Sequence, residues 1–287
     1  MKIYKISPQG FCNGVKYAIN ILNKTIDDLN TPRPIYLLGN LIHNKVLMDE
    51  FKEKGVIVIK GGKRYDMLDE AKSGTVIFSA HGVSPRVYDK ALKKGLNIVD
   101  ATCPNVLIIH NQIIKYLQND FEIIYIGTKN HPECEGVIEI SDKIHLITSL
   151  DEINSLSLNN KNIYITNQTT LSIYDIEDIY LKLKEKYPFA VVENKICQAT
   201  TLRQKALLNQ NDAQICIVVG DKTSSNSKKL KTVSEEKALI KSYLVETEDD
   251  LDKNWFKNIS SVSVTSGAST PSEITDRVIQ RIKEIAD

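Results

Sequence analysis

The chain has 287 residues, of which 42% are hydrophobic and 25% are charged, and its 37 Lys and Arg side chains nearly balance its 36 Asp and Glu side chains. This length corresponds to about two or three domains with hydrophobic cores, and the composition excludes a disordered or collagen-like chain. The formal net charge of +1 argues against an overall electrostatic attraction to nucleic acid or to an anionic membrane, so we expect neither partner.

Three features of the sequence indicate a cytoplasmic protein. No stretch approaches the roughly 20 apolar residues that span a bilayer. The first ten residues, MKIYKISPQG, lack the apolar segment of a signal peptide. The five cysteines are sparse and include no C-x-x-C pair, which makes a poor disulfide scaffold and fits a reducing compartment.

Short apolar runs alternate with helix-compatible segments along the whole chain. In chain order, the runs that we expect to form strands are residues 3–6, 35–39, 56–59, 76–79, 98–99, 124–127, 144–147, 163–166, 191–196, 217–220, 242–245 and 262–265. A helix is expected over 105–118, another after Ser84 and Pro85, and a third after the segment TPSE (270–273), which has the spacing of a capping box. Strands that alternate with helices are typical of parallel sheets, so the predicted class is α/β.

Three cysteines occur at nearly equal spacing, which indicates an internal repeat. Cys103 lies 91 residues after Cys12, and Cys197 lies 94 residues after Cys103. Each cysteine follows an apolar run and precedes a helix-compatible segment. We therefore expect each thiol to lie where a strand gives way to a helix.

Two further landmarks recur in the same three copies. The first is a polar cluster that begins at the glycine after an apolar run, and its copies are GNLIHN (39–44), GTKNHPE (127–133) and GDKTSSN (220–226). The second lies 69, 66 and 72 residues after the three cysteines, and its copies are FSAHG with His81, TNQTT with Thr169 and TSGAS with Ser269. Because ligands of parallel sheets bind beyond the carboxyl ends of the strands, we expect all these landmarks to face one cavity.

The repeats predict three similar α/β lobes with parallel sheets, arranged around a pseudo-threefold axis. We expect the first lobe at 13–102, the second at 103–195 and the third at 196–287. The third repeat is one strand short, whereas the N-terminal strand belongs to no earlier unit. Residues 1–12 are therefore expected to complete the third lobe.

Three thiolates that meet on one axis are suited to a soft metal. Sulfur-only coordination indicates zinc or an iron-sulfur cluster, and zinc is the weaker option because a structural zinc site takes four closed ligands. The candidate ligands Cys12, Cys103 and Cys197 would hold three irons of a cubane and leave the fourth open. The alternative for each of them is a small buried residue at a strand end. Cys216 lies in an apolar run and is assigned to the core, whereas Cys134 either fills a turn or lies near the cavity.

The other landmark residues are mostly neutral donors and imidazoles, which suit an anionic ligand. They are His43, His81, His131, Glu133, Thr169, Ser224, Ser225, Asn226 and Ser269. The Ser and Asn residues lie where helices are expected to begin, a position that favours phosphate, although plain N-capping is the alternative. Glu133 either complements a helix dipole or delivers protons. The sequence holds no P-loop, no glycine-rich dinucleotide motif and no H-E-x-x-H.

Several motifs are dispersed along the chain in a definite order. They are GFCNGV (10–15), SAHGVS (79–84), DATCP (100–104), HPE (131–133), NQTTLS (167–172), SSNS (224–227) and GAS (267–269). Together they resemble those of the 4-hydroxy-3-methylbut-2-enyl diphosphate reductases, and the resemblance covers nearly the whole chain. It implies a three-lobed iron-sulfur oxidoreductase of the non-mevalonate isoprenoid pathway, which reduces this allylic diphosphate to isopentenyl and dimethylallyl diphosphate with electrons from ferredoxin or flavodoxin.

The same resemblance implies a role for each landmark residue. Cys12, Cys103 and Cys197 would hold a 4Fe–4S cluster. Glu133 would be the proton donor, while Thr169 and His131 would contact the substrate and orient its hydroxyl group. The diphosphate would be held by His43, His81, Ser224, Ser225, Asn226 and Ser269. Two alternatives stay open, namely a 4Fe–4S hydro-lyase acting on a small phosphorylated substrate and a non-catalytic iron-sulfur sensor.

Overall fold

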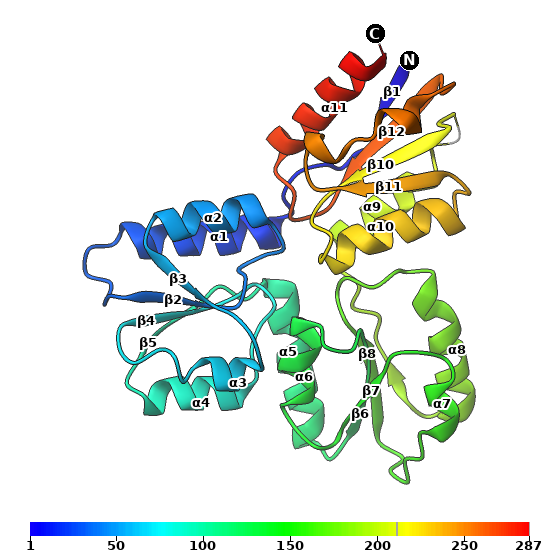
Figure 1. Cartoon of the computed structure of the whole chain (residues 1–287). Coiled ribbons are helices and arrows are strands. Elements are labelled where there is room, and N and C mark those ends of the chain that lie inside the picture. Colours follow the sequence, from blue (N-terminus) through cyan, green and yellow to red (C-terminus); the bar gives the residue numbers. More distant parts are fainter. Residues whose placement is uncertain (211, 287) are drawn as a thin grey trace.

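The computed structural model describes residues 1–210 and 212–286, which form three lobes around a common centre (Figure 1). The first lobe contains α1 (Asn13–Asp27), β2 (Ile35–Leu38), α2 (Lys45–Glu53), β3 (Val56–Ile59), α3 (Arg64–Met67), β4 (Thr75–Phe78), α4 (Pro85–Lys93) and β5 (Asn97–Asp100). The second contains α5 (Pro104–Gln118), β6 (Glu122–Ile126), α6 (Pro132–Ile138), β7 (Ile144–Ile147), α7 (Glu152–Ser155), β8 (Ile163–Asn167), α8 (Asp175–Lys186) and β9 (Val191–Val192). The third contains β1 (Lys2–Lys5), α9 (Gln198–Leu207), β10 (Ile215–Val219), α10 (Ser225–Glu236), β11 (Lys241–Val245), two 3₁₀ helices (Glu248–Asp250 and Lys253–Phe256), β12 (Ser261–Ser266) and α11 (Ser272–Ala286).

Each lobe is built on a four-stranded parallel sheet, and the strand order repeats. The orders are β3-β2-β4-β5, β7-β6-β8-β9 and β11-β10-β12-β1. In every sheet the chain runs from one inner strand to the edge strand beside it, and then crosses to the other inner strand. The loops after these two inner strands flank the point where the strand order reverses, which is where ligands of parallel α/β sheets bind. The α/β class and the three-lobed architecture predicted from the sequence are confirmed.

The N-terminal strand belongs to the third sheet. β1 pairs in parallel with β12, with Ile3 opposite Val262 and Lys5 opposite Val264. Both ends of the described chain therefore lie in the same lobe, at the top of Figure 1. The pairing gives the third sheet the same number of strands as the other two.

The inner strands are buried on both faces, which explains their continuous apolar sequences. All residues of β4 and β10 are buried, and amphipathic helices such as α1 and α11 cover the sheets with their apolar sides. Cys216 lies in β10 and packs against Leu207 and Leu230. Its assignment to the core is confirmed.

Two local expectations are wrong. The run 191–196 forms a strand only at Val191–Val192, because the Asn194 side chain accepts a hydrogen bond from the Ile196 backbone N–H (2.9 Å) and turns the chain out of the sheet. The TPSE segment forms no capping box, because α11 begins at Ser272 and the Thr270 hydroxyl donates to the backbone carbonyl that ends β10 (3.0 Å). The other expected strands agree with the observed bounds to within about two residues.

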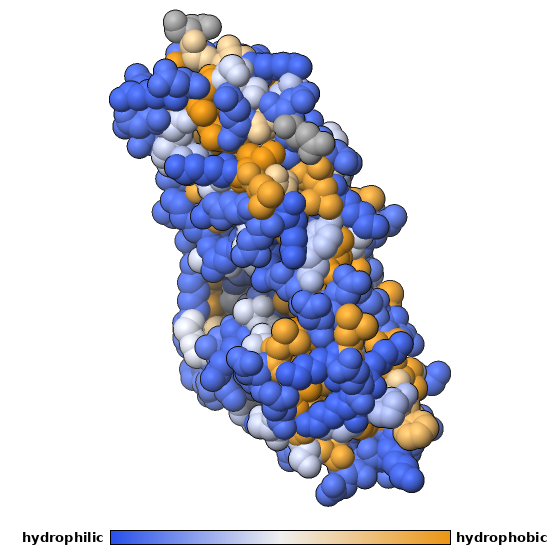
Figure 2. Space-filling model, turned by 90° about the vertical axis from the view of Figure 1, so that its right-hand side faces the viewer, coloured by the Kyte–Doolittle hydropathy of each residue, from blue (hydrophilic) through white to orange (hydrophobic). Residues whose placement is uncertain are grey.

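The surface on the side of the second and third lobes is mainly hydrophilic. Figure 2 shows that hydrophobic side chains on this face occur in separate groups between charged and polar ones. In residues 1–210 and 212–286, no helix is long and apolar enough to cross a membrane.

Candidate active site

One cavity of about 370 Å³ lies between the three lobes, beyond the carboxyl ends of their inner strands. Its lining includes Cys12, His43, His81, Cys103, His131, Glu133, Thr169, Cys197, Ser224, Ser225, Asn226 and Ser269. These are all twelve candidate site residues of the sequence analysis. The fold therefore brings together residues from nine separate segments of the chain, three in each repeat.

The three cysteines occupy equivalent positions in the three lobes. Each follows an edge strand and immediately precedes a helix, with Cys12 before α1, Cys103 before α5 and Cys197 before α9. The backbone N–H of each cysteine donates a 3.0 Å hydrogen bond to the loop after the adjacent inner strand. The acceptors are the carbonyl oxygens of Ala268, Ala80 and Thr169. Each cysteine therefore lies at the N-terminus of a helix, the end that carries a positive partial charge.

The three thiols suit a group with several metal atoms better than a single ion. Among the described residues, no three His, Cys, Asp or Glu side chains lie close enough together to share one metal ion. The sulfur atoms of Cys12 and Cys103 both lie next to Gly14, where a Cβ atom would overlap Cys103 Sγ and lie 3.9 Å from Cys12 Sγ. The space at these thiols therefore depends on glycine. An iron-sulfur cluster, in which each thiolate binds its own iron, fits this donor set.

Burial opposes the deprotonation of two of these cysteines, Cys103 and Cys197. It raises the pKa of Cys103 to about 11, and the charges of Cys12 and Cys197 add to this rise, while backbone hydrogen bonds from the first turn of α5 limit it. Burial also raises the pKa of Cys197, against a hydrogen bond with Thr200 Oγ1 (3.1 Å). A bound metal cation would offset this cost of deprotonation.

The sequence analysis misses a buried cation beside the cysteines. Arg203 lines the cavity from α9 and is almost fully buried. Its guanidinium group donates hydrogen bonds to the backbone carbonyl oxygens of Gly10 (2.6 Å), Ala199 (3.2 Å) and Ser266 (3.3 Å). Burial lowers the pKa of Arg203, whereas Cys12 and Cys197 raise it, so the guanidinium and the thiolates stabilise each other. A detectable signal was its position six residues after Cys197, on the same predicted helix.

Glu133 is the one carboxylate in the cavity lining formed by the described residues. It lies in α6 and is only 2% exposed. The backbone N–H and the hydroxyl group of Thr169 donate to its two oxygens at 2.8 Å each, and the Tyr125 hydroxyl donates at 3.3 Å. Burial raises the pKa of Glu133 to about 7, and these hydrogen bonds limit the rise. A carboxyl group with this pKa can donate a proton near neutral pH.

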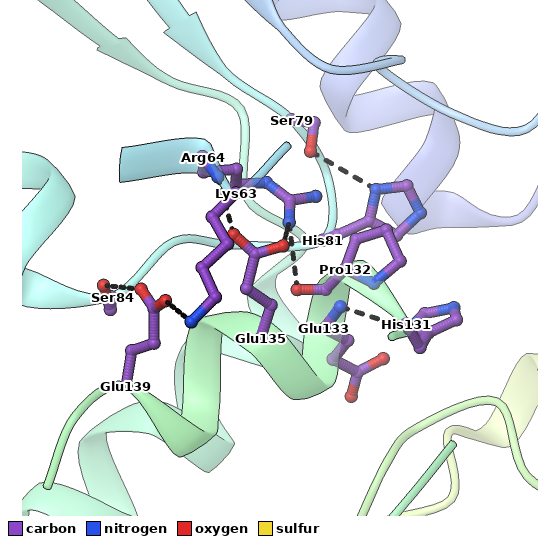
Figure 3. A network of polar contacts seen from close by, with 10 residues as sticks. All are labelled: Lys63, Arg64, Ser79, His81, Ser84, His131, Pro132, Glu133, Glu135 and Glu139. Atoms are coloured by element: carbon purple, nitrogen blue, oxygen red, sulfur yellow. Dashed lines mark hydrogen bonds and ion pairs between the residues drawn. The ribbon is translucent and has the colours of Figure 1, made fainter. Parts of the chain in front are cut away.

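Three histidines from the first two lobes lie side by side. The distance between ring centroids is 5.0 Å for His43 and His81, 5.7 Å for His81 and His131, and 6.2 Å for His43 and His131. Burial is the main cause that lowers all three pKa values, to about 3 for His131. The Nδ1 atom of His131 accepts a hydrogen bond from the Glu133 backbone N–H (3.1 Å; Figure 3), so the proton of the neutral ring is on Nε2.

The third lobe adds buried donors at the N-terminus of α10. Ser224 caps this helix by accepting a hydrogen bond from the Ser227 backbone N–H (3.3 Å). Both amide atoms of Asn226 and the Nε2 atom of His43 are buried without a hydrogen-bond partner among the described residues. The Ser269 hydroxyl donates to the His43 carbonyl oxygen (2.9 Å) and so joins the third lobe to the first. Buried polar groups of this kind are normally satisfied, so an anion that accepts from them fits the site.

Cys134 and Asn167 lie close in the chain to residues of the cavity lining without belonging to it. Cys134 lies in α6 rather than in a turn, and its thiol donates to Gln168 Oε1 at 3.3 Å. Asn167 ends β8, where its side-chain oxygen accepts from the Tyr180 hydroxyl (2.6 Å) and from the Lys195 backbone N–H (2.8 Å). Both side chains support the segments that carry Glu133 and Thr169.

Comparisons with known proteins agree with one another. The family described as LytB protein matches residues 3–283. The 4-hydroxy-3-methylbut-2-enyl diphosphate reductase of Geobacillus kaustophilus (strain HTA426) is 46% identical over 286 residues, which cover 99% of this chain and 90% of that protein. The solved structure of the E-1-hydroxy-2-methyl-but-2-enyl-4-diphosphate reductase from Plasmodium falciparum is 34% identical with a TM-score of 0.90, covering 97% of this chain and 87% of the other. A solved structure of (E)-4-hydroxy-3-methyl-but-2-enyl diphosphate reductase, described as the terminal enzyme of the non-mevalonate pathway, is 30% identical with a TM-score of 0.68, covering 99% and 100%.

Proposed function

The chain belongs to the LytB protein family, and from this premise we propose that it catalyses the reductive dehydroxylation of 4-hydroxy-3-methylbut-2-enyl diphosphate. The reaction consumes two electrons and two protons, releases water, and yields isopentenyl or dimethylallyl diphosphate, as the last step of the non-mevalonate pathway. The observation that carries the proposal is the cavity itself. It combines three cysteines, one carboxyl group with a pKa of about 7, and two buried donors, Asn226 Nδ2 and His43 Nε2, that have no hydrogen-bond partner among the described residues.

Cys12, Cys103 and Cys197 would hold a 4Fe–4S cluster, with one thiolate from each lobe. Such a cluster, when bound, supplies electrons and an open iron that acts as a Lewis acid. Ferredoxin or flavodoxin would provide the electrons. Gly14 leaves room beside two of the sulfur atoms, and the positive charge of Arg203 offsets part of the negative charge of the thiolates.

The diphosphate would bind to the histidines of the first lobe and to the start of α10. The residues that would contact it are His43, His81, Ser224, Ser225, Asn226 and Ser269. Phosphate oxygens would accept hydrogen bonds from the buried Asn226 amide and from His43 Nε2, which otherwise lose the free energy of hydration without compensation. The positive end of α10, a helix of 12 residues, would add to this attraction.

Glu133 would protonate the leaving hydroxyl group. Its pKa of about 7 keeps a substantial fraction of the carboxyl groups protonated at neutral pH. The Thr169 hydroxyl, 2.8 Å from Glu133 Oε2, would relay this proton and hold the substrate oxygen. The Nδ1 atom of His131 is occupied by the Glu133 backbone, so its Nε2–H would be the donor that orients the substrate.

Two further assignments follow from the same features. The free thiols are suited to a reducing compartment, so we assign the reaction to the cytoplasm. We also divide the chain into lobes at 13–102, 103–195 and 196–287, with residues 1–12 completing the third. The repeated sheets support this division, because each boundary follows an edge strand and lies at or next to a cysteine.

The proposal is tested by reconstituting the whole chain with iron and sulfide without oxygen and adding 4-hydroxy-3-methylbut-2-enyl diphosphate. We expect both five-carbon diphosphates to form only when a low-potential reductant is present. Turnover without reductant would indicate a redox-neutral hydro-lyase instead. An intact cluster without any turnover would indicate a non-catalytic iron-sulfur protein, and either result would contradict the proposal.

A further inference from the structure

A buried ion pair joins the first lobe to the helix that carries Glu133 (Figure 3). Arg64, the first residue of α3, places Nη1 3.1 Å from Glu135 Oε2 and 3.2 Å from the Pro132 carbonyl oxygen. The Arg64 backbone N–H donates to Glu135 Oε1 at 2.7 Å. One residue of the first lobe therefore holds α6 at its first residue and again one turn further along.

A second pair at the same interface is different in character. Lys63 Nζ lies 3.6 Å from Glu139 Oε1, but the Lys63 side chain is 70% exposed, whereas the Arg64 side chain is 6% exposed. Exposed pairs contribute little to stability, because water and salt screen them. The pair of Arg64 and Glu135, which we call the clasp, is better shielded because its cation is buried, although the Glu135 side chain is 21% exposed.

The position of α6 between the lobes explains what the clasp can do. The helix has seven residues, too few to be stable in isolation, so its orientation depends on what it packs against. Glu133 faces the second lobe, where Thr169 and Tyr125 bind its carboxyl group, and Glu135 faces the first lobe. At Gly136, an added Cβ atom would lie 3.3 Å from the Gly82 carbonyl oxygen of the first lobe, so the backbones approach closely here.

We propose that the clasp is a positioning device for the reaction, and this inference rests on the function proposed above. The clasp fixes α6 against the first lobe, and so sets the places of Glu133 and of His131, which directly precedes the helix. Its contribution is geometric rather than a gain in stability, because apolar residues in place of a buried ion pair are often equally stabilising. Arg64 Nε, buried without a partner among the described residues, adds to the cost of keeping this pair.

A double-mutant cycle on the reconstituted holoenzyme tests the clasp. We expect Arg64→Met and Glu135→Met each to lower kcat by on the order of 10- to 100-fold, the size typical of a displaced catalytic group, with a much smaller change in KM. The loss in the double variant should be smaller than the two single losses combined, since both changes remove the ion pair between Arg64 Nη1 and Glu135 Oε2. Arg64→Lys should recover part of the rate because it retains a positive charge opposite Glu135.

The two single variants change the net charge in opposite directions, which separates positioning from electrostatic attraction. Opposite shifts of KM with unchanged kcat would show that Arg64 acts only through its charge, and would overturn the proposal. Additive losses in the double variant would also overturn it. Lys63→Gln is the matched control at the same interface, and we expect its kcat and KM to equal those of the wild type.

A second readout does not depend on turnover. The protonated carboxyl group of Glu133 is measured by infrared difference spectroscopy against Glu133→Gln while the pH is varied. We expect its titration midpoint to move in Arg64→Met and to stay in place in Lys63→Gln. A cooperative thermal unfolding transition in each variant would show that both are folded. If the wild type fails to turn over the allylic diphosphate, the proposed function fails while this titration still tests the clasp. An unmoved midpoint in Arg64→Met would refute the clasp whatever the reaction.

Discussion

The threefold repeat is strict at the cysteines, where all three lobes carry the same residue. It is loose in the segments after the first inner strands, where each lobe carries different residues. Each cysteine precedes a helix, follows an edge strand and is fixed by a 3.0 Å backbone hydrogen bond, in all three lobes alike. The loops after β2, β6 and β10, together with the first turns of the helices that follow them, occupy equivalent places but carry different groups. They supply His43 in the first lobe, His131 and Glu133 in the second, and Ser224 to Asn226 in the third.

This difference follows from the ligands that the two regions would bind. A 4Fe–4S cluster would be held by one thiolate from each lobe, so one residue type in one geometry would serve all three. The substrate carries a diphosphate at one end and a hydroxyl group at the other, so it needs anion donors in one place and a proton donor in another. A site that binds both ligands therefore needs identical cysteines in the three lobes and different side chains in the neighbouring segments.

We expect the largest effect on iron content and turnover when one of the three equivalent cysteines is replaced. Replacing Cys12, Cys103 or Cys197 by Ser should remove most of the bound iron and all measurable turnover, because a hydroxyl group is a poor ligand for this soft-metal site. Iron is quantified after anaerobic reconstitution. Cys216→Ser is the matched control, since Cys216 is buried in the core of the third lobe, and it should keep its iron. Equal iron loss at Cys216 would contradict the threefold site.

Replacing the proposed proton donor should affect turnover without affecting the iron held by the cysteines. Glu133→Gln should keep the iron but lower kcat by about 100-fold or more, because the amide cannot donate the proton that the carboxyl group supplies. Turnover and iron content are measured on the same sample. Glu122→Gln, which alters a half-buried carboxylate paired with His145 away from the cavity, should retain both. Near-normal turnover of Glu133→Gln would refute its assigned role.

The anion donors should affect substrate binding more than the chemical step. Asn226→Ala removes a buried amide for which we expect a phosphate partner, and a lost hydrogen bond to a charged group corresponds to a KM increase of about tenfold or more. Steady-state kinetics on the reconstituted chain measure the effect. Asn119→Ala, at the exposed end of α5, serves as the control. A kcat loss with unchanged KM would place Asn226 outside the diphosphate site.

The smallest effect concerns the pH dependence of turnover. Because burial raises the pKa of Glu133 to about 7, the protonated acid is lost as the pH rises through 7, and kcat should fall by up to about tenfold per further pH unit. The Tyr125 hydrogen bond lowers this pKa, so Tyr125→Phe should shift the falling limb to higher pH by less than about one unit. A shift to lower pH would contradict this electrostatic assignment.

Much of the site was predictable because its residues lie at strand ends of a repeat. Cys12, Cys103 and Cys197 share one local context, and parallel topology then requires the following loops to converge. Local sequence predicted the ends of helices and strands less well where a side chain forms its own hydrogen bond with the backbone. Asn194 ends β9 early, and Thr270 bonds the end of β10 instead of capping α11.

Contacts between distant segments could not be predicted. Arg64 and Glu135 are 71 residues apart, and Arg64 stands in the charged run KGGKR, which resembles an ordinary solvated surface. Tyr125 lies in an apolar strand, so its sequence context indicates a core residue and gives no sign of the hydroxyl group that reaches Glu133. These side chains gain their roles only from the packing of α6 between two lobes.

Three equivalent cysteines would hold one cluster and leave one iron without a protein thiolate. Mössbauer spectroscopy of the reconstituted chain, with the iron content measured on the same sample, tests this arrangement. We expect about four irons per chain, of which three share one environment and the fourth differs and responds to added substrate. A single mononuclear metal, or four irons that all ignore the substrate, would contradict it.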